Sequence, residues 1–196
     1  EACRLAPDVQ TPRGQLVTQR NLGMYLLGSG QLDQASEVLY DYLRAATELG
    51  LQRNSRYPLE YRLLGELHLL RGEWEQAVTH LEEATRIGEQ TGSRISFYAT
   101  CSYWACGLWF QGRMDEARGV FERYPLLEVS DLSFPFLARS LYALFLLHNG
   151  QRDTAESVWA AAEPEIAKPS VASLEDWAAL WEAHCHVAAA APGSQD

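Results

Sequence analysis

A glycine followed five residues later by an alanine occurs four times in this chain at almost even spacing. Other positions keep the same register. A small residue stands seven residues before each glycine, an acid stands three residues after it, and a bulky residue follows each alanine by four. Four copies in register indicate one structural unit used four times. The pairs are Gly30 and Ala35, Gly72 and Ala77, Gly112 and Ala117, and Gly150 and Ala155, with successive glycines 42, 40 and 38 residues apart.

Each copy is typical of two antiparallel helices joined by a tight turn. The glycine suits the turn, where a positive φ costs it little. The small residue and the alanine let the two backbones approach closely, and the acid complements the dipole of the second helix. The bulky residue fills space between neighbouring hairpins, whose apolar faces are buried by stacking. The small residues are Gly23, Gly65, Ala105 and Ala143; the acids are Asp33, Glu75, Asp115 and Asp153; the bulky residues are Leu39, Leu81, Phe121 and Trp159.

With these positions the chain resembles a tetratricopeptide repeat array over roughly residues 14–167. The spacing exceeds the usual repeat of about 34 residues. In this respect the chain is similar to the long repeats of bacterial multidomain transcriptional regulators, the maltose-activator-like and nucleotide-switch ATPases. Two copies carry most of the resemblance: Tyr61, Leu64, Gly65, Gly72, Ala77, Leu81 and Ala84 in residues 61–92, and Leu22, Gly23, Gly30, Ala35 and Leu39 in residues 19–50.

We therefore expect an all-α fold, a right-handed α-solenoid of about four helical hairpins with a ninth helix at its C-terminal end. The ninth helix, over residues 172–190, either caps the array or begins a fifth repeat. Residues 1–13 are predicted to be the end of a preceding helix and a linker, and residues 191–196 a tail. The four repeats are expected near residues 14–50, 56–92, 94–125 and 134–167.

Helix limits follow from the same register. Pro58 and Pro135 stand where a helix tolerates proline, in its first turn, and Pro125 should end its helix early. Pro164 either closes or kinks the last helix. The first helices of the pairs are predicted near 14–29, 56–71, 94–111 and 134–149, and the second helices near 32–49, 74–91, 114–124 and 152–166.

Composition narrows the class of protein. The net charge of −10 and the pI near 5.0 disfavour contact with nucleic acid, which requires a basic surface. No apolar run is long enough to cross a membrane, and the first residues lack the pattern of a signal peptide. The four cysteines form no C-x-x-C pair, so reduced and mostly buried thiols in a cytoplasmic protein are predicted. The start at Glu1 suggests a piece of a longer polypeptide.

The chain offers little that predicts catalysis. Residues 184–186, His-Cys-His, are consecutive, and a helix splays consecutive side chains too far apart to ligate one metal. No nucleophile elbow, phosphate loop or zinc-protease motif is present. We predict a non-enzyme without cofactor or metal. Among the other histidines, His68 is expected in the core with a satisfied nitrogen, and His80 at the surface.

The resemblance implies a concave face lined by the first helix of each pair. That face is apolar and aromatic in its middle, with Arg20 and Arg62 at one end. It would suit an amphipathic helix, an apolar peptide or a small acid with an apolar body. Met24 and Glu66 stand where chaperone-tail receptors need asparagine, which disfavours that class. The predicted site comprises Arg20, Met24, Arg62, Glu66, Leu69, Ser102, Cys106, Trp109, Phe110, Ser140, Leu144 and His148.

Two functions are consistent with this face. The first is a sensing or docking module of a larger bacterial transcriptional regulator, which binds a protein, a peptide or a small-molecule effector and responds to other domains of its own chain. The alternative is a freestanding adaptor that joins proteins or forms a homodimer through its terminal hairpins.

Overall fold

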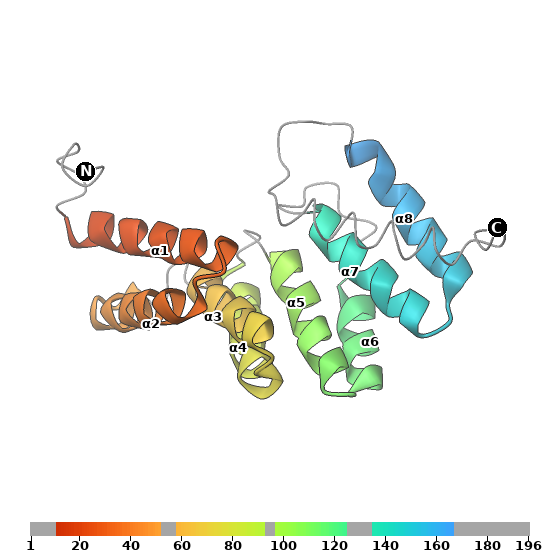
Figure 1. Cartoon of the computed structure of the whole chain (residues 1–196), viewed down its shortest axis with the longest axis horizontal. Helices are drawn as coiled ribbons and strands as arrows, with labels where there is room; N and C mark the ends of the chain where they lie inside the picture. Colours follow the sequence, from red (N-terminus) through yellow and green to blue (C-terminus); the bar gives the residue numbers. More distant parts are fainter. Residues whose placement is uncertain (1–10, 52–57, 93–96, 125–134, 167–196) are drawn as a thin grey trace. The chain divides into compact units, whose positions relative to one another are not determined.

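The computed structural model describes residues 11–51, 58–92, 97–124 and 135–166. All regular structure in these ranges is helical, which confirms the all-α prediction. Consecutive helices lie side by side as hairpins (Figure 1). The pairs are α1 (Pro12–Gly28) with α2 (Leu32–Glu48), α3 (Pro58–Arg71) with α4 (Trp74–Thr91), α5 (Phe97–Phe110) with α6 (Met114–Arg123), and α7 (Pro135–His148) with α8 (Arg152–Ile166).

The chain divides into two compact units, Glu1–Ser93 and Arg94–Asp196. The division falls between the second and third predicted repeats. In unit 1, α2 of the first hairpin packs against α3 of the second; in unit 2, α5 packs against α7. Each unit is therefore a stack of two hairpins, as expected for repeats that bury their apolar faces against a neighbour.

Helix limits agree with the sequence pattern to within three residues. Pro58 and Pro135 are the first residues of α3 and α7, and α6 is short, with 10 residues. Pro164 lies inside α8, which continues to Ile166. α1 begins at Pro12, inside the segment predicted as a linker, and Thr11 caps it by accepting a hydrogen bond from the backbone N–H of Gly14 at 3.0 Å. The predicted ninth helix and the predicted tail lie outside the described residues.

The turn glycines have the predicted backbone conformation. Gly30, Gly72, Gly112 and Gly150 take φ values of 73°, 73°, 77° and 71° at the four hairpin turns. This left-handed region favours glycine over every residue with a Cβ atom. The acid three residues later lies in the first turn of each second helix, as expected.

Close approach of the helices depends on the small residue of each first helix. A Cβ atom built on Gly23 would lie 2.5 Å from Leu39 Cδ2, and one built on Gly65 would lie 2.3 Å from Leu81 Cγ. The bulky residue thus packs on the small residue of its own hairpin. Leu39 also joins a buried cluster with Leu63 of the next hairpin, so it fills space between hairpins as predicted.

Candidate functional site

The predicted site residues separate by exposure. Met24, Phe110 and His148 are exposed, and Arg20, Leu69, Trp109 and Leu144 are half-buried. The remaining members of the set are buried. These are Arg62, Glu66, Ser102, Cys106 and Ser140.

Arg62 and Glu66 form a buried ion pair on α3. Arg62 Nη1 lies 2.8 Å from Glu66 Oε2, and the two side chains are 7% and 10% exposed. A buried charge is stabilised chiefly by its partner, and loss of either one leaves the other uncompensated. The present geometry of this pair therefore serves the fold of unit 1.

The buried members of unit 2 have little chemistry to offer at the surface. The hydroxyl of Ser102 donates to the carbonyl of Tyr98 at 2.9 Å. Burial raises the pKa of the Cys106 thiol to about 12, so the thiol stays protonated and unreactive at neutral pH. The Ser140 hydroxyl is buried and has no hydrogen-bond partner within the described residues.

The exposed and half-buried members of unit 2 form an aromatic surface. We define the aromatic patch as Trp109 and Phe110 at the end of α5 with Leu144 and His148 on α7. The rings of Trp109 and Phe110 stack with centroids 5.3 Å apart, and the His148 ring meets Trp109 edge-on at 5.1 Å. The ring of buried Phe145 lies edge-on to that of Trp109, with their centroids 5.8 Å apart. Because α5 packs against α7, the four residues come together from two hairpins.

In unit 1 the accessible members of the predicted site are Arg20 and Met24 on α1 and Leu69 on α3. Met24 is 39% exposed, and Val17, two turns before it on the same face, is 43% exposed. Between them Arg20 donates from Nη2 to the side chain of Asn21 at 3.3 Å, while its Nε is buried without a partner among the described residues. This face of α1 combines apolar surface with one guanidinium group.

A second group of polar residues in unit 1 was not predicted as a site. His68 is buried, as expected; its Nδ1 lies 2.5 Å from Glu73 Oε2 and its Nε2 lies 2.9 Å from the hydroxyl of Tyr40. The expectation for His80 was wrong: it is half-buried, because it stacks on the His68 ring at 5.2 Å. The repeat register contains the missed signal, since Tyr40 follows the bulky Leu39 and His80 precedes the bulky Leu81 at the contact between hairpins.

Glu60 is a buried carboxyl that the sequence pattern also did not single out. It is 5% exposed, and Oε1 accepts a hydrogen bond from the hydroxyl of Tyr42. Burial raises the pKa of Glu60 to about 7, although the Tyr42 hydrogen bond and the charge of Arg20 act in the opposite direction. Glu60 therefore titrates near neutral pH.

The described ranges contain neither a metal cluster nor a membrane-spanning helix. No three His, Cys, Asp or Glu side chains in these ranges come together in a way that could hold a metal ion. Likewise, none of the helices described is both long and apolar enough to cross a membrane.

Comparisons with known proteins agree with this geometry. Residues 61–83, which span most of α3 and half of α4, match the sequence model of the tetratricopeptide repeat. No curated protein matches the chain. Among solved structures, a kinesin light chain candidate of Podosopora anserina with nearly identical TPR-like repeats is 18% identical, with a TM-score of 0.61 over 92% of this chain and 90% of that one. A single-substitution variant of it is 17% identical, with a TM-score of 0.61 over 90% and 88% of the two chains.

These likenesses define the class of the protein as an all-α protein of TPR-like helical repeats. Such a fold is typically a non-enzymatic scaffold that presents an extended binding surface. The match at residues 61–83 is more specific than the structural likeness, because the sequence itself fits a tetratricopeptide repeat there. Together they indicate a non-catalytic module for protein–protein interaction.

Proposed function

We propose that this chain is a binding module that takes up a peptide or an amphipathic helix of a protein partner on the first helices of unit 2, α5 and α7, with the aromatic patch as the main contact. The observation that carries the proposal is the exposure of Phe110, which is 49% exposed although it stacks on Trp109. Large exposed aromatic side chains in a contiguous group are typical of interaction sites.

The aromatic patch is also held in place before any partner arrives. Trp109 contacts the rings of Phe110, Phe145 and His148. Aromatic pairs of this kind contribute about 0.5–1.5 kcal/mol beyond the area they bury. A side chain already fixed by its neighbours loses little conformational freedom on binding, which favours affinity.

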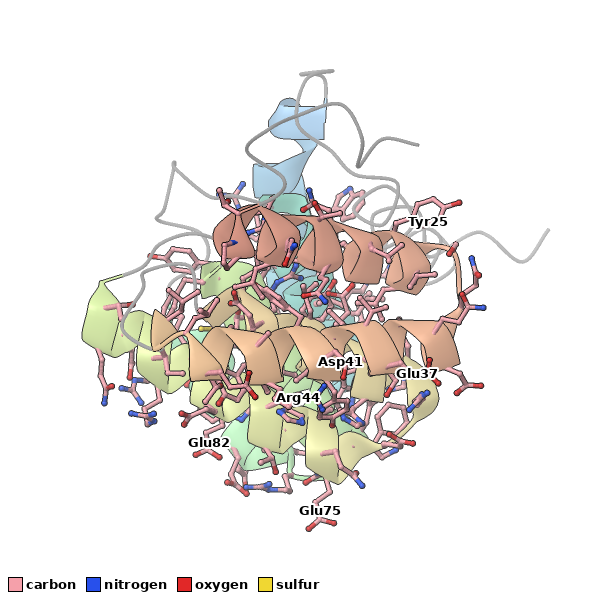
Figure 2. All side chains as sticks on the ribbon, turned by 90° about the vertical axis from the view of Figure 1, so that its left-hand side faces the viewer. Tyr25, Glu37, Asp41, Arg44, Glu75 and Glu82 are labelled. Carbon is pink, nitrogen blue, oxygen red and sulfur yellow. The ribbon has the colours of Figure 1, made fainter. Side chains whose placement is uncertain are left out.

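Charge supports the choice of the first helices. α1, α5 and α7 contain no acid, and both acids of α3, Glu60 and Glu66, are buried. The second helices carry the exposed acids, several of which project from α2 and α4 in Figure 2. A partner with acidic flanks is therefore repelled by the second helices and tolerated by the first. The exposed acids include Asp33, Glu37, Asp41, Glu48, Glu75, Glu82, Glu89, Asp115, Glu116, Glu122, Asp153 and Glu156.

Within this proposal the chain is the docking or sensing module of a larger bacterial transcriptional regulator in the cytoplasm. The repeat spacing of 38–42 residues supports this reading, because it resembles the long repeats of such regulators. The partner is then another protein or another domain of the same polypeptide. The alternative is that a small-molecule effector binds the same face. Native mass spectrometry of the purified chain distinguishes them, because a co-purified effector appears as a fixed mass increment.

A second function, self-association, is favoured by one observation. α1 exposes Val17, Leu22, Met24 and Tyr25, the last at 68%. A terminal hairpin with apolar surface tends to pair with another copy. Sedimentation velocity tests this reading: a dimer that Leu22→Lys converts to a monomer supports an adaptor, and a monomer at all concentrations refutes it.

The main proposal is tested with displayed peptides of about 16 residues, the length of a helix of four to five turns. Peptides selected on the intact chain are measured against Phe110→Ala and against Tyr25→Ala, a matched truncation of an exposed aromatic residue on α1. We expect at least about a tenfold loss of affinity for Phe110→Ala, equivalent to about 1.4 kcal/mol, and no change for Tyr25→Ala. Equal affinity of all three proteins would refute the patch as the contact.

Arg20 is tested separately from Arg62. Charge reversal at Arg62 would leave Glu66 facing a second carboxylate in a buried position and would destabilise unit 1 whatever its role in binding. Arg20→Glu changes a half-buried residue that forms no buried ion pair, although its charge also acts on the pKa of Glu60. If peptides with acidic flanks bind Arg20→Glu as well as they bind the unmodified chain, Arg20 does not belong to the site.

A further inference from the structure

Four polar side chains from three helices and one turn meet in unit 1. We define the Tyr40 cluster as Tyr40 on α2, His68 on α3, Glu73 at the start of α4, and His80 on α4. The Tyr40 hydroxyl lies 2.9 Å from His68 Nε2 and 3.4 Å from His80 Nε2. His68 Nδ1 lies 2.5 Å from Glu73 Oε2. The two imidazole rings are nearly parallel, at 9°.

The groups that surround the cluster are also defined. The Tyr61 ring of α3 lies 6.1 Å from the His80 ring. Arg71 binds Asp33 at 2.6 Å and the carbonyl of Leu32 at 3.1 Å, so its charge is engaged across the hairpins. Burial and the charge of Glu73 raise the pKa of Tyr40, against a smaller opposing effect of Arg71. The Tyr40 hydroxyl therefore keeps its proton at every pH where histidine titrates.

These contacts fix the positions of the hydrogens when both histidines are neutral. Glu73 is an acceptor, so His68 carries its proton on Nδ1 and leaves Nε2 as an acceptor. Tyr40 then donates to His68 Nε2, and its oxygen accepts from Nε2–H of His80. The result is one directed chain, from His80 through Tyr40 and His68 to Glu73.

We propose that the Tyr40 cluster is a proton-binding site that takes up one proton at His68 and, through reversal of the Tyr40 hydroxyl, switches His80 from one neutral tautomer to the other. Protonated His68 donates from both nitrogens, so its Nε2–H now points at the Tyr40 oxygen. The hydroxyl hydrogen must then turn to His80 Nε2, which becomes an acceptor. His80 releases the proton of Nε2 to water and gains one on Nδ1, with no net change of charge on that ring.

The cluster keeps all its hydrogen bonds before and after proton uptake. Protonation of His80 in addition to His68 is unfavourable. Two imidazolium rings with centroids 5.2 Å apart would repel each other. In agreement, burial and the neighbouring His68 lower the pKa of His80 to about 4. The site therefore binds one proton and not two over the range in which exposed histidines titrate.

The consequence appears at the surface of α4. His80 is half-buried and its Nε2 faces Tyr40, so Nδ1 is the ring nitrogen left at the rim of the cluster for a partner outside it. Before proton uptake this nitrogen is an acceptor, and after it a donor. A hydrogen-bonding partner at this rim therefore meets opposite polarity in the two states, while the packing of α2 on α3 is unchanged.

Nitrogen-15 NMR of the histidine rings in the full chain tests the proposal directly. The His80 tautomer is followed over a titration across the usual histidine range while His68 takes up its proton. In the same pH interval His80 should exchange an Nε2–H signal for an Nδ1–H signal. His148, which lies on unit 2 and is not part of the cluster, serves as an internal reference. Retention of the Nε2–H tautomer by His80 while His68 titrates would overturn the proposal, as would protonation of His80 before His68.

Two variants separate the relay from mere packing. Tyr40→Phe keeps the ring and removes the hydroxyl, so the His80 tautomer should no longer follow the titration of His68. Tyr25→Phe removes an exposed hydroxyl elsewhere in unit 1 and should leave the coupling intact. If Tyr40→Phe lowers the helicity seen by circular dichroism, His68→Gln replaces it, and His80 should then show one tautomer throughout. Coupling that persists in either variant would refute the role of Tyr40.

Discussion

The close packing of α3 on α4 predicts a large effect from a single methyl group at Gly65. In Gly65→Ala the new Cβ atom would lie 2.3 Å from Cγ, 2.7 Å from Cδ2 and 3.1 Å from Cδ1 of Leu81. Leu81 is fully buried, and its Cγ is the branch point of the side chain, so the contact cannot be relieved by turning a terminal methyl group alone. The two helices must separate or Leu81 must leave its rotamer.

The magnitude follows from two opposing effects. Overpacking of a buried site costs typically about 1–3 kcal/mol. Replacement of glycine by alanine inside a helix stabilises by about 0.5–1 kcal/mol. We therefore expect Gly65→Ala to lower the free energy of unfolding by about 1–2 kcal/mol.

Gly119→Ala is the matched control, because Gly119 lies inside α6 and a Cβ atom there would meet no atom within 4 Å. This variant gains only the higher helix propensity of alanine over glycine, and it should be more stable by about 0.5–1 kcal/mol. Urea unfolding followed by circular dichroism measures both changes. A Gly65→Ala protein as stable as the unmodified chain would refute the claim that Gly65 sets the distance between α3 and α4.

Three further predictions concern titratable groups. Because the folded-state pKa of Glu60 is raised to about 7 from 4.5, its contribution to stability is full below about pH 4.5 and is lost as pH rises through 7. Glu60→Gln should remove this dependence and stabilise the protein at pH 8 by up to about 3 kcal/mol, as read from urea midpoints at several pH values; a loss of stability at pH 8 would contradict it. His80 acts in the opposite direction: its folded-state pKa is lowered, so stability should fall as pH drops from about 6.5 toward 4, and His80→Phe should flatten that slope in thermal melts. Cys106 should resist alkylation by iodoacetamide at pH 8 in the folded chain and react in urea, as followed by mass spectrometry, whereas rapid labelling of the folded chain would show an accessible thiolate.

The fold was predictable from the sequence because the repeat acts through backbone geometry. Gly30 and Gly72 mark turns that need positive φ, and the spacing between them sets the lengths of the helices. Pro58 marks the start of α3, since proline costs a helix no hydrogen bond in its first turn. These rules depend on one residue and its neighbours in the chain.

The candidate site was less predictable because exposure depends on residues distant in sequence. Arg62 and Glu66 occupy positions that line the concave face in the resemblance, yet they satisfy each other in a buried pair. His80 lies among acids on α4, and the rings of Tyr40, Tyr61 and His68, which are 40, 19 and 12 residues before it, approach its ring. Phe110 keeps its exposure because it is the last residue of α5.

The separation of charge between first and second helices also determines which face of each unit adsorbs to a charged surface. In the described part of each unit the exposed acids lie on α2 and α4 or on α6 and α8, and none lies on the first helices. On a positively charged matrix or sensor chip each unit should thus adsorb by its second helices. In a unit adsorbed in this way, the face with Met24 in unit 1 or the face with Phe110 in unit 2 remains turned toward the solution, so immobilisation by charge leaves that face accessible for measurements of partner binding without a tag.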